Sequence, residues 1–273
     1  MEVTASSAAA AKLTVSLAVT GVRSDGYHLI SAEMVSVDLF DYVSVVPSES
    51  SSVVIEDPTG RLALLEARFG SIPLDRDNIA IRALERCGAK GAVRIIKNIP
   101  FGAGLGGGSS DAAAVLRLLG RSDDLVLAGA LGADVPFCLR GGRAFVGGIG
   151  EEIAPLDHRD ESFVLFLVPI VISTADVYRC FDSVGPGPEP GRNHLLHAAL
   201  VVSPELGSVK SMVERELGIE LDLAGSGSTL FWRGTLNDLV SSKKLRDLGS
   251  GRVGYRWEGL DIEVVEVSAL PAL

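Results

Sequence analysis

The sequence predicts an α+β fold of two domains, and three observations support this. Strand, hairpin-turn and helix patterns are mixed along the chain and do not alternate regularly. The chain has 273 residues, enough for one large or two ordinary domains. Hydrophobic residues make up 47%, which can fill a sizeable core. We place the domain boundary near Gly150, which divides the chain into 1–150 and 151–273.

The first elements are predicted from short apolar patterns and from the turn and cap residues between them. Residues 12–19 and 42–46 are expected to be strands, with a turn at 24–28 between them. Asp77 and Asn78 can cap a helix over 79–87, because short polar side chains accept hydrogen bonds from first-turn N–H groups. A third strand is expected at 92–96.

A glycine-rich segment follows this strand and precedes an apolar, alanine-rich helix pattern over 111–119. Five glycines fall within residues 102–108. A glycine loop that enters a helix N-terminus presents free backbone N–H groups and the positive end of the helix dipole. Glycine allows close backbone approach and positive φ, so the segment is predicted to bind a phosphate.

Two familiar phosphate-loop patterns fit this segment poorly. The P-loop fails because Gly108 stands where lysine is required. The dinucleotide fingerprint is met by Gly102, Gly104 and Gly107, and acidic residues follow about twenty residues on. Those acidic residues open another helix pattern instead of ending a second strand, so this match is weak.

The remaining elements continue the mixture. A helix is expected over 125–131, followed by the turn Asp134-Val135-Pro136. Strands are expected at 143–146 and 163–168, with a Gly/Pro loop at 185–191. A second small-residue turn, 224–228, lies inside the apolar segment 223–232.

Charge and cysteine usage restrict the partners and the compartment. The formal net charge is −10, and no basic stretch suggests a nucleic-acid surface. Three cysteines are far apart, which favours a reducing compartment over disulfides or a zinc site. No apolar run is long enough to span a membrane, and the N-terminus lacks the basic start of a signal peptide. We expect a cytoplasmic protein with small-molecule partners.

Several segments together resemble the GHMP family of small-molecule kinases. Pro100, the Gly104-Leu105-Gly106 triplet and the Ser109-Ser110 pair follow the family's phosphate loop. The motifs DGYH and LGADVPF are typical of its isoprenoid-pathway branch. The resemblance implies a ribosomal-protein-S5-like N-terminal domain, a ferredoxin-like C-terminal domain and a site between them. It also implies ATP-dependent phosphorylation of the 2-hydroxyl of a cytidine-linked methylerythritol.

The resemblance assigns roles to individual residues. Asp134 matches the catalytic aspartate, and Lys12 matches the other catalytic position, where its charge would favour an ionised aspartate and a developing alkoxide. Asn78 and Lys97 match segments near the adenosine. The third family motif matches Gly225, Ser226, Gly227 and Ser228, which is expected to close over the site. The expected ATP-binding residues are Pro100, Phe101, Gly102, Ala103, Gly104, Leu105, Gly106, Gly107, Gly108, Ser109 and Ser110.

Substrate and metal expectations follow from the same match. Tyr27 and His28 match positions that cradle the cytidine, and Asn193 lies in a segment expected to face substrate. Thr14 replaces the family's usual asparagine, so substrate contact there is expected to differ. Asp111 is interpreted as structural, with a metal role as the minor alternative. Mg²⁺ is expected to be held mainly by ATP oxygens and water, without dedicated protein ligands.

Three other functions are open on sequence grounds. Thr14 favours a GHMP kinase that acts on another small alcohol. A non-catalytic nucleotide-binding relative would be expected to lack Asp134 or Lys12, and both are present. A dinucleotide-dependent oxidoreductase has only the weak glycine fingerprint.

Overall fold

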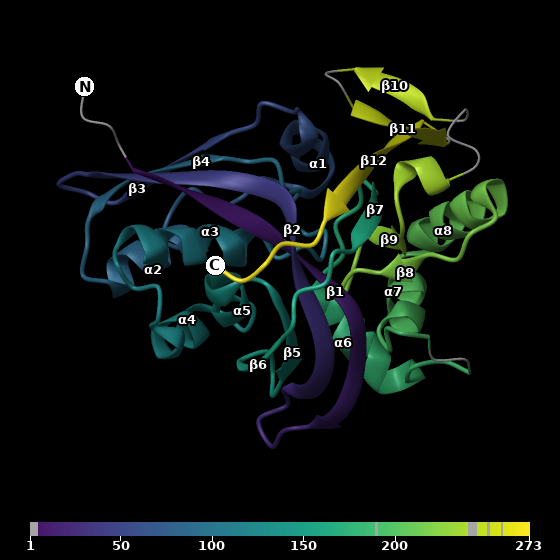
Figure 1. Ribbon diagram of the computed structural model, residues 1–273, viewed down its shortest axis with the longest axis horizontal. Coiled ribbons are helices and arrows are strands. Elements are labelled where there is room, and N and C mark those ends of the chain that lie inside the picture. The colour runs from purple at the N-terminus through teal and green to yellow at the C-terminus, as the bar shows by residue number, and fades with distance from the viewer. Residues whose placement is uncertain (1–4, 189–190, 240–244, 250–251, 258) are drawn as a thin grey trace.

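The computed structural model describes residues 5–188, 191–239, 245–249, 252–257 and 259–273, and these form two sheets with helices packed around them (Figure 1). Within this described part, the first sheet has six strands in the order β3-β4-β2-β5-β6, with β1 paired to β2. Only β3 and β4 run parallel; the other neighbours are antiparallel. The strands are β1 (Ser6–Val22), β2 (His28–Pro47), β3 (Ser52–Glu56), β4 (Gly91–Ile96), β5 (Arg143–Gly147) and β6 (Glu152–Leu156).

Helices cover one face of this sheet (Figure 1). They are α2 (Ile79–Arg86), α3 (Gly107–Leu118), α4 (Leu125–Leu131) and α5 (Val135–Arg140). Alanines on α3 are fully buried, which lets this helix lie close to β1. The separate helix α1 (Arg61–Phe69) lies beside the second sheet.

The second sheet has the order β10-β11-β12-β7-β9-β8 within the described residues. It consists of β7 (Ser162–Leu167), β8 (Asp222–Leu223), β9 (Leu230–Arg233), β10 (Arg246–Gly249), β11 (Arg252–Trp257) and β12 (Leu260–Ser268). Three helices pack with it: α6 (Thr174–Val184), α7 (Leu196–Val202) and α8 (Pro204–Leu217). The predicted α+β fold is confirmed.

An apolar cluster joins the two sheets. Leu13 and Val35 from the first sheet are buried with Phe163, Leu165 and Phe231 from the second. The rings of Phe163 and Phe231 pack edge to face, with centroids 6.0 Å apart. Burial of these large side chains contributes roughly 1.5–3 kcal/mol each, so the cluster fixes one sheet against the other.

The chain's last described residues return to the first sheet. Ala269 bridges Val37, and Ala272 bridges Gly141 at the end of α5. The N–H of Leu273 donates to the carbonyl of Arg140 over 3.1 Å. Figure 1 accordingly shows the C-terminus beside α3 and α5. A segment that follows the second sheet therefore completes the surroundings of the first.

Most of the predicted elements are present, with different limits. The first two strands are longer than 12–19 and 42–46, and α3 begins at Gly107, not at residue 111. Gly150 lies in the turn between the paired strands β5 and β6. The first sheet therefore continues to Leu156, and we propose that the domain boundary follows that residue.

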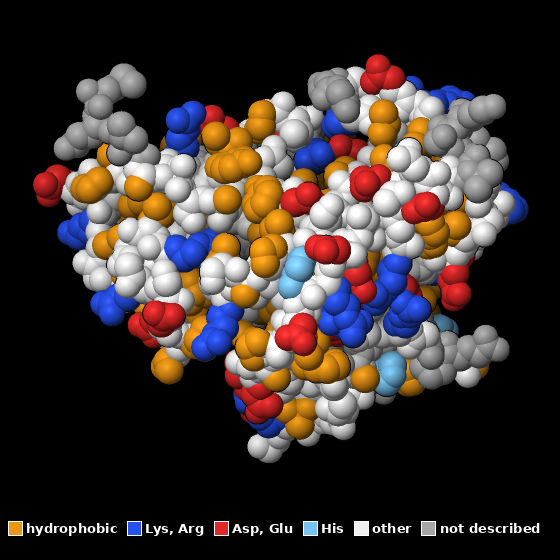
Figure 2. Space-filling view, in the orientation of Figure 1, with side chains coloured by type: hydrophobic (Ala, Val, Ile, Leu, Met, Phe, Trp, Pro, Cys, Tyr) orange, Lys and Arg blue, Asp and Glu red, His pale blue; other side chains and the backbone are white. Residues whose placement is uncertain are grey.

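The surface carries mixed charges on the face shown in Figure 2, with hydrophobic side chains grouped over the first sheet. Tyr42, Val46 and Val54 are among the exposed apolar side chains of its strands. Among the described residues, no helix has the length and apolar character needed to cross a membrane.

Candidate active site

A cavity of about 520 Å³ lies where the glycine loop meets both sheets. β1, the turn that precedes α5 and the third motif each supply part of its wall. Most of the residues predicted to be functional line it: Lys12, Thr14, Pro100, Phe101, Gly102, Ala103, Gly104, Gly106, Gly107, Gly108, Ser109, Asp134, Gly225 and Ser226. Residues separated by most of the chain therefore meet at one site.

The two predicted catalytic side chains form an ion pair in this cavity. The Nζ of Lys12 lies 3.3 Å from Oδ2 of Asp134 and donates to Oγ1 of Thr14 over 3.1 Å. Lys12 comes from β1 and is buried, while Asp134 immediately precedes α5. The Asp134 side chain makes no cap hydrogen bond to that helix. Its carboxylate is therefore available to the cavity.

The glycine loop depends on backbone shapes that favour glycine. Gly102, Gly104 and Gly106 have φ of 65°, 77° and 67°. A Cβ on Gly106 would lie 2.7 Å from Cγ of Lys12, so the loop rests directly on the lysine stem. Gly106 is the N-cap of α3, and the first N–H groups of a helix have no intrahelical acceptor. These groups and the helix dipole are suited to binding an anion.

The early start of α3 corrects the sequence-based limits. Residues 107–110 are its first turn, although two are glycines with low helix propensity. Two residues predicted to bind ATP, Leu105 and Ser110, do not line the cavity. The Leu105 side chain belongs to the apolar cluster between the sheets. The Ser110 hydroxyl donates to the carbonyl of Ala10 over 2.6 Å, so it ties α3 to β1.

The third motif packs against the glycine loop. A Cβ on Gly104 would lie well under 3.0 Å from the carbonyl oxygen of Ala224, so only glycine permits this contact. The N–H of Thr229 donates to the carbonyl of Ala103 over 3.1 Å. Gly227 and Ser228 lie behind the cavity wall, where the Ser228 hydroxyl is bonded to the carbonyls of Val168 and Ile170.

Asn193 has a structural partner for each end of its amide. Its Nδ2 donates to the carbonyls of Leu223 and Gly225 over 2.8 and 2.7 Å, and its Oδ1 accepts the N–H of Leu195. Asn193 is buried and does not line the cavity. This geometry favours support of the third motif over the substrate contact expected from the sequence.

The aromatic end of the site contains one residue that the sequence analysis did not single out. Tyr178 on α6 lines the cavity and stacks on His28 with ring centroids 4.7 Å apart. Burial, with a smaller contribution from the negative charge of Asp134, raises the pKa of Tyr178 to about 12. Tyr27 is 58% exposed beside this pair, with the Arg23 guanidinium 5.4 Å from its ring centroid. Nε2 of His28 lies 2.6 Å from Oδ1 of Asp182.

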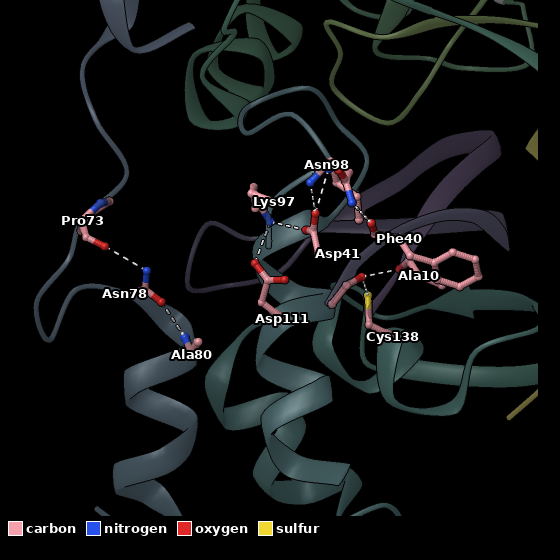
Figure 3. Close-up of polar contacts among 12 residues, drawn as sticks. Ala10, Phe40, Asp41, Pro73, Asn78, Ala80, Lys97, Asn98, Asp111 and Cys138 are labelled. Carbon is pink, nitrogen blue, oxygen red and sulfur yellow. Dashed lines mark hydrogen bonds and ion pairs between the residues drawn. The ribbon is translucent and has the colours of Figure 1, made fainter. Parts of the chain in front are cut away.

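A second cavity, of about 260 Å³, lies on the other side of the glycine loop. Asn78, Lys97, Phe101, Gly108 and Asp111 contribute to its lining. The Asn78 side chain caps α2 by accepting the N–H of Ala80 over 2.9 Å, as predicted, and its Nδ2 donates to the carbonyl of Pro73 (Figure 3). Lys97 and Asp111 are ion-paired in the protein interior. Asp111 is thus tied to Lys97 in the wall of this cavity, and its structural interpretation stays a prediction.

Comparisons with known proteins fit this architecture. Residues 76–142, which contain the glycine loop and Asp134, match the family described as GHMP kinases N terminal domain. The chain is 36% identical over 187 residues to 4-diphosphocytidyl-2-C-methyl-D-erythritol kinase of Clostridium beijerinckii. This match spans 63% of either chain, less than two thirds of the relative.

Two further matches cover more of the chain. The enzyme of the same name from Clostridium botulinum strain Alaska E43 is 34% identical over 269 residues, which is 86% of this chain and 91% of the relative. A crystal structure of 4-(cytidine 5'-diphospho)-2C-methyl-D-erythritol kinase matches with a TM-score of 0.63 and 36% identity. It covers 83% of this chain and 89% of its own.

The fold and the loop-centred cavity thus define a GHMP kinase. Within that class, the chain belongs to the 4-diphosphocytidyl-2-C-methyl-D-erythritol kinase family.

Proposed function

We propose that this protein phosphorylates the 2-hydroxyl of 4-diphosphocytidyl-2-C-methyl-D-erythritol with ATP, in non-mevalonate isoprenoid precursor biosynthesis. The names of the relatives supply the substrate. One observation carries the chemistry: the Lys12–Asp134 pair shares a cavity with the N-terminus of α3. A proton acceptor, a cation and a phosphate cradle are the components that phosphoryl transfer to an alcohol needs.

The roles follow from charge and position. Asp134 accepts the proton of the substrate hydroxyl, because its carboxylate is not used in capping α5. Lys12 lies 3.3 Å from that carboxylate and stabilises negative charge on the attacking oxygen. The N–H groups of the glycine loop and α3 bind the ATP phosphates. Charge stabilisation therefore comes from fixed groups that need no rearrangement.

ATP fits the two cavities that flank the loop. Its phosphates lie against residues 102–109, and the adenosine occupies the cavity lined by Asn78 and Lys97. Among the described residues no cluster of His, Cys, Asp or Glu could hold a metal ion by itself. A Mg²⁺ ion bound with the nucleotide would be held mainly by phosphate oxygens and water, and it would supply charge shielding for the transferred phosphoryl group.

The acceptor lies toward the aromatic end of the larger cavity. Tyr178 lines the wall there, and His28 stacks on it, which suits a planar cytosine. Tyr27 is exposed beside this pair and can close on a bound base. The hydroxyl of Thr14 is already an acceptor for Lys12. Thr14 therefore shapes the acceptor site mainly through the lysine. We propose the cytoplasm as the compartment of the reaction, because the cysteine usage favours a reducing compartment.

An ADP-release assay tests the function. Purified protein with Mg·ATP is offered the cytidine-linked substrate, homoserine, mevalonate or galactose in separate reactions. The proposal expects rapid ADP release with the cytidine-linked substrate and little with the others. Turnover of another alcohol at a higher kcat/KM would establish the alternative that Thr14 favours. Absence of ADP release with every acceptor would contradict the kinase assignment.

A further inference from the structure

The two ends of the glycine loop are tied together by a buried lysine. Lys97 directly follows β4, ahead of the loop, and is 3% exposed. Its Nζ donates to Oδ2 of Asp111 over 2.6 Å and to Oδ2 of Asp41 over 2.5 Å. Asp111 lies on α3, beyond the loop. The Lys97–Asp111 contact thus closes the loop at its base, as Figure 3 shows.

Asp41 holds the first residues of the loop at the same point. Its second oxygen, Oδ1, accepts the backbone N–H groups of Asn98 and Ile99 over 2.6 and 2.8 Å (Figure 3). Nδ2 of Asn98 donates to the carbonyl of Phe40 over 2.7 Å. Contacts with Phe40 and Asp41 of β2 therefore set the direction in which the chain leaves β4.

A second ion pair connects this point to the other sheet. Arg61 of α1 donates through Nη1 to the carbonyl of Asn98 over 2.7 Å. Its Nε and Nη2 donate to the two oxygens of Glu263 over 2.8 and 2.6 Å. Glu263 lies on β12, and both side chains are largely buried. An unbroken series of contacts therefore runs from Glu263 on β12 through Arg61 to Asn98 at the start of the loop.

Space and charge make this arrangement sensitive to change. A Cβ on Gly107 would lie 2.9 Å from Nζ of Lys97, so the start of α3 rests on the ammonium. Burial alone would lower the pKa of Lys97, but the two carboxylates outweigh it and the pKa is raised. Burial raises the pKa of Asp111 to about 7 against the opposing effect of Lys97. Removal of one partner from such a buried pair is strongly destabilising.

We propose that Lys97, Asp41 and Asp111 form a clasp that fixes the geometry of the glycine loop, and that the Arg61–Glu263 pair couples the clasp to the second sheet. Asp111 and Glu263 are then positioning residues for the phosphates of ATP, acting through the loop. The effect on ATP rests on the proposed function, whereas the effect on loop order does not.

The experiment compares four variants with the wild type. Asp111→Ala removes the tie at the far end of the loop, and Asp111→Asn keeps an acceptor for Lys97. Glu263→Gln weakens the link to the second sheet. Glu33→Gln is the matched control, because Glu33 forms a similarly buried pair with Arg143 that does not contact the loop. Hydrogen exchange of the amides at 102–108 and calorimetric ATP binding are measured for each folded protein.

The clasp predicts graded effects. Asp111→Ala raises exchange at 102–108 and raises the ATP Kd about tenfold, equivalent to about 1.4 kcal/mol. Asp111→Asn gives an amide exchange rate and an ATP Kd between those of Asp111→Ala and the wild type. Glu263→Gln raises both quantities, but by less than Asp111→Ala does. Glu33→Gln leaves loop exchange and the ATP Kd unchanged, even if its Tm falls.

Two results would overturn the clasp. The first is that the amides at 102–108 exchange in Asp111→Ala and Glu263→Gln at the wild-type rate. The second is that Glu33→Gln raises the exchange rate of these amides as much as Asp111→Ala does. If Asp111→Ala does not fold, Asp111→Asn and Glu263→Gln decide by the same criteria. If the wild type binds no ATP, the proposed function fails, and the exchange comparison alone decides for or against the clasp.

Discussion

The carboxylate of Asp134 can serve as a base because no other task occupies it. It stands at the N-terminus of α5, where an aspartate often caps the helix, yet it makes no such bond. Its neighbour is instead the ammonium of Lys12, which is itself held by Thr14. The ion pair leaves one carboxylate oxygen for an incoming hydroxyl.

Asp134→Asn is expected to lower kcat by roughly 10²–10⁴-fold, the range for loss of a positioned acid or base. The amide preserves size but removes charge and basicity. ATP affinity should change little, because phosphate binding is assigned to residues 102–109. Single-turnover kinetics isolate the chemical step, and calorimetry provides the ATP control. A single-turnover rate close to that of the wild type would remove Asp134 from the reaction.

Asp111 should give stability a dependence on pH. Its pKa is raised from the ordinary 3.8 to about 7, chiefly by burial. Between these values the native state holds a proton that the unfolded chain has released. The free energy of unfolding therefore falls as pH rises from about 4 to about 7, and this loss is complete above that range.

Urea unfolding at pH 5 and pH 8 measures this effect against Asp111→Asn, which cannot titrate at that position. The wild type should lose stability relative to the variant between the two pH values. Parallel changes in both proteins would show that Asp111 does not release its proton in this range.

At the scale of elements, the contact between the glycine loop and the third motif is the most restrictive feature of the site. Gly104 has φ of 77° and lies against the carbonyl of Ala224. A side chain there must move the third motif or the loop. Gly120, at the end of α3, has a similar φ of 70° but nothing within 4 Å of a Cβ. Gly104 and Gly120 therefore have nearly the same backbone conformation, but only a Cβ at Gly104 would meet neighbouring atoms.

Gly104→Ala is expected to weaken ATP binding at least tenfold, whereas Gly120→Ala should leave it unchanged. Both substitutions place a side chain in the left-handed region and cost roughly 1–2 kcal/mol of stability. Only the first displaces backbone at the site. Calorimetric Kd values and thermal unfolding of both variants separate the two effects. Equal ATP affinity in the two variants would contradict the role given to this contact.

The same elements show what the sequence could and could not predict. The cap at Asn78 and the glycine loop have local causes, and both were predicted. The start of α3 was missed because Gly107 and Gly108 favour helix poorly. In the structure Gly107 packs on Lys97, and Gly108 lies beside Ile79. The alanines at the beginning of β1 favour helix, yet they pair with β2. Tyr178 and the roles of Asn193 and Ser110 depend on contacts between distant segments.

For the whole molecule, the return of residues 269–273 links the end of the second sheet to the first sheet through backbone hydrogen bonds. Leu270 donates to the carbonyl of Ser36, and Leu273 donates to that of Arg140. Ala272 lies against Gly142, where a Cβ would be 2.8 Å from its backbone nitrogen. No local sequence pattern predicts this pairing, because its partners, Ser36 and Arg140, come before the whole second sheet in the chain.

Deletion of residues 270–273 should lower stability by about 1–3 kcal/mol, given about 0.5–1.5 kcal/mol per lost hydrogen bond. The Tm should fall by roughly 2–4 °C per kcal/mol for a chain of this size. Leu273→Ala is the control, because its side chain is 77% exposed and the backbone bonds remain. Unfolding scans compare the two. An unchanged Tm after the deletion would show that the returning segment adds nothing to the first sheet.

The returning segment also has a consequence for the order of events during synthesis. A ribosome completes the strands of the first sheet and the helices that pack on it, with Lys12 and Asp134, before it begins the second sheet. The partners of Ser36, Arg140 and Gly141 emerge only after β12 has been made. Domains generally fold as units from the N-terminus onward. The backbone groups of Arg140 and Gly141 therefore lack these contacts in the nascent first sheet until residues 272 and 273 have been made.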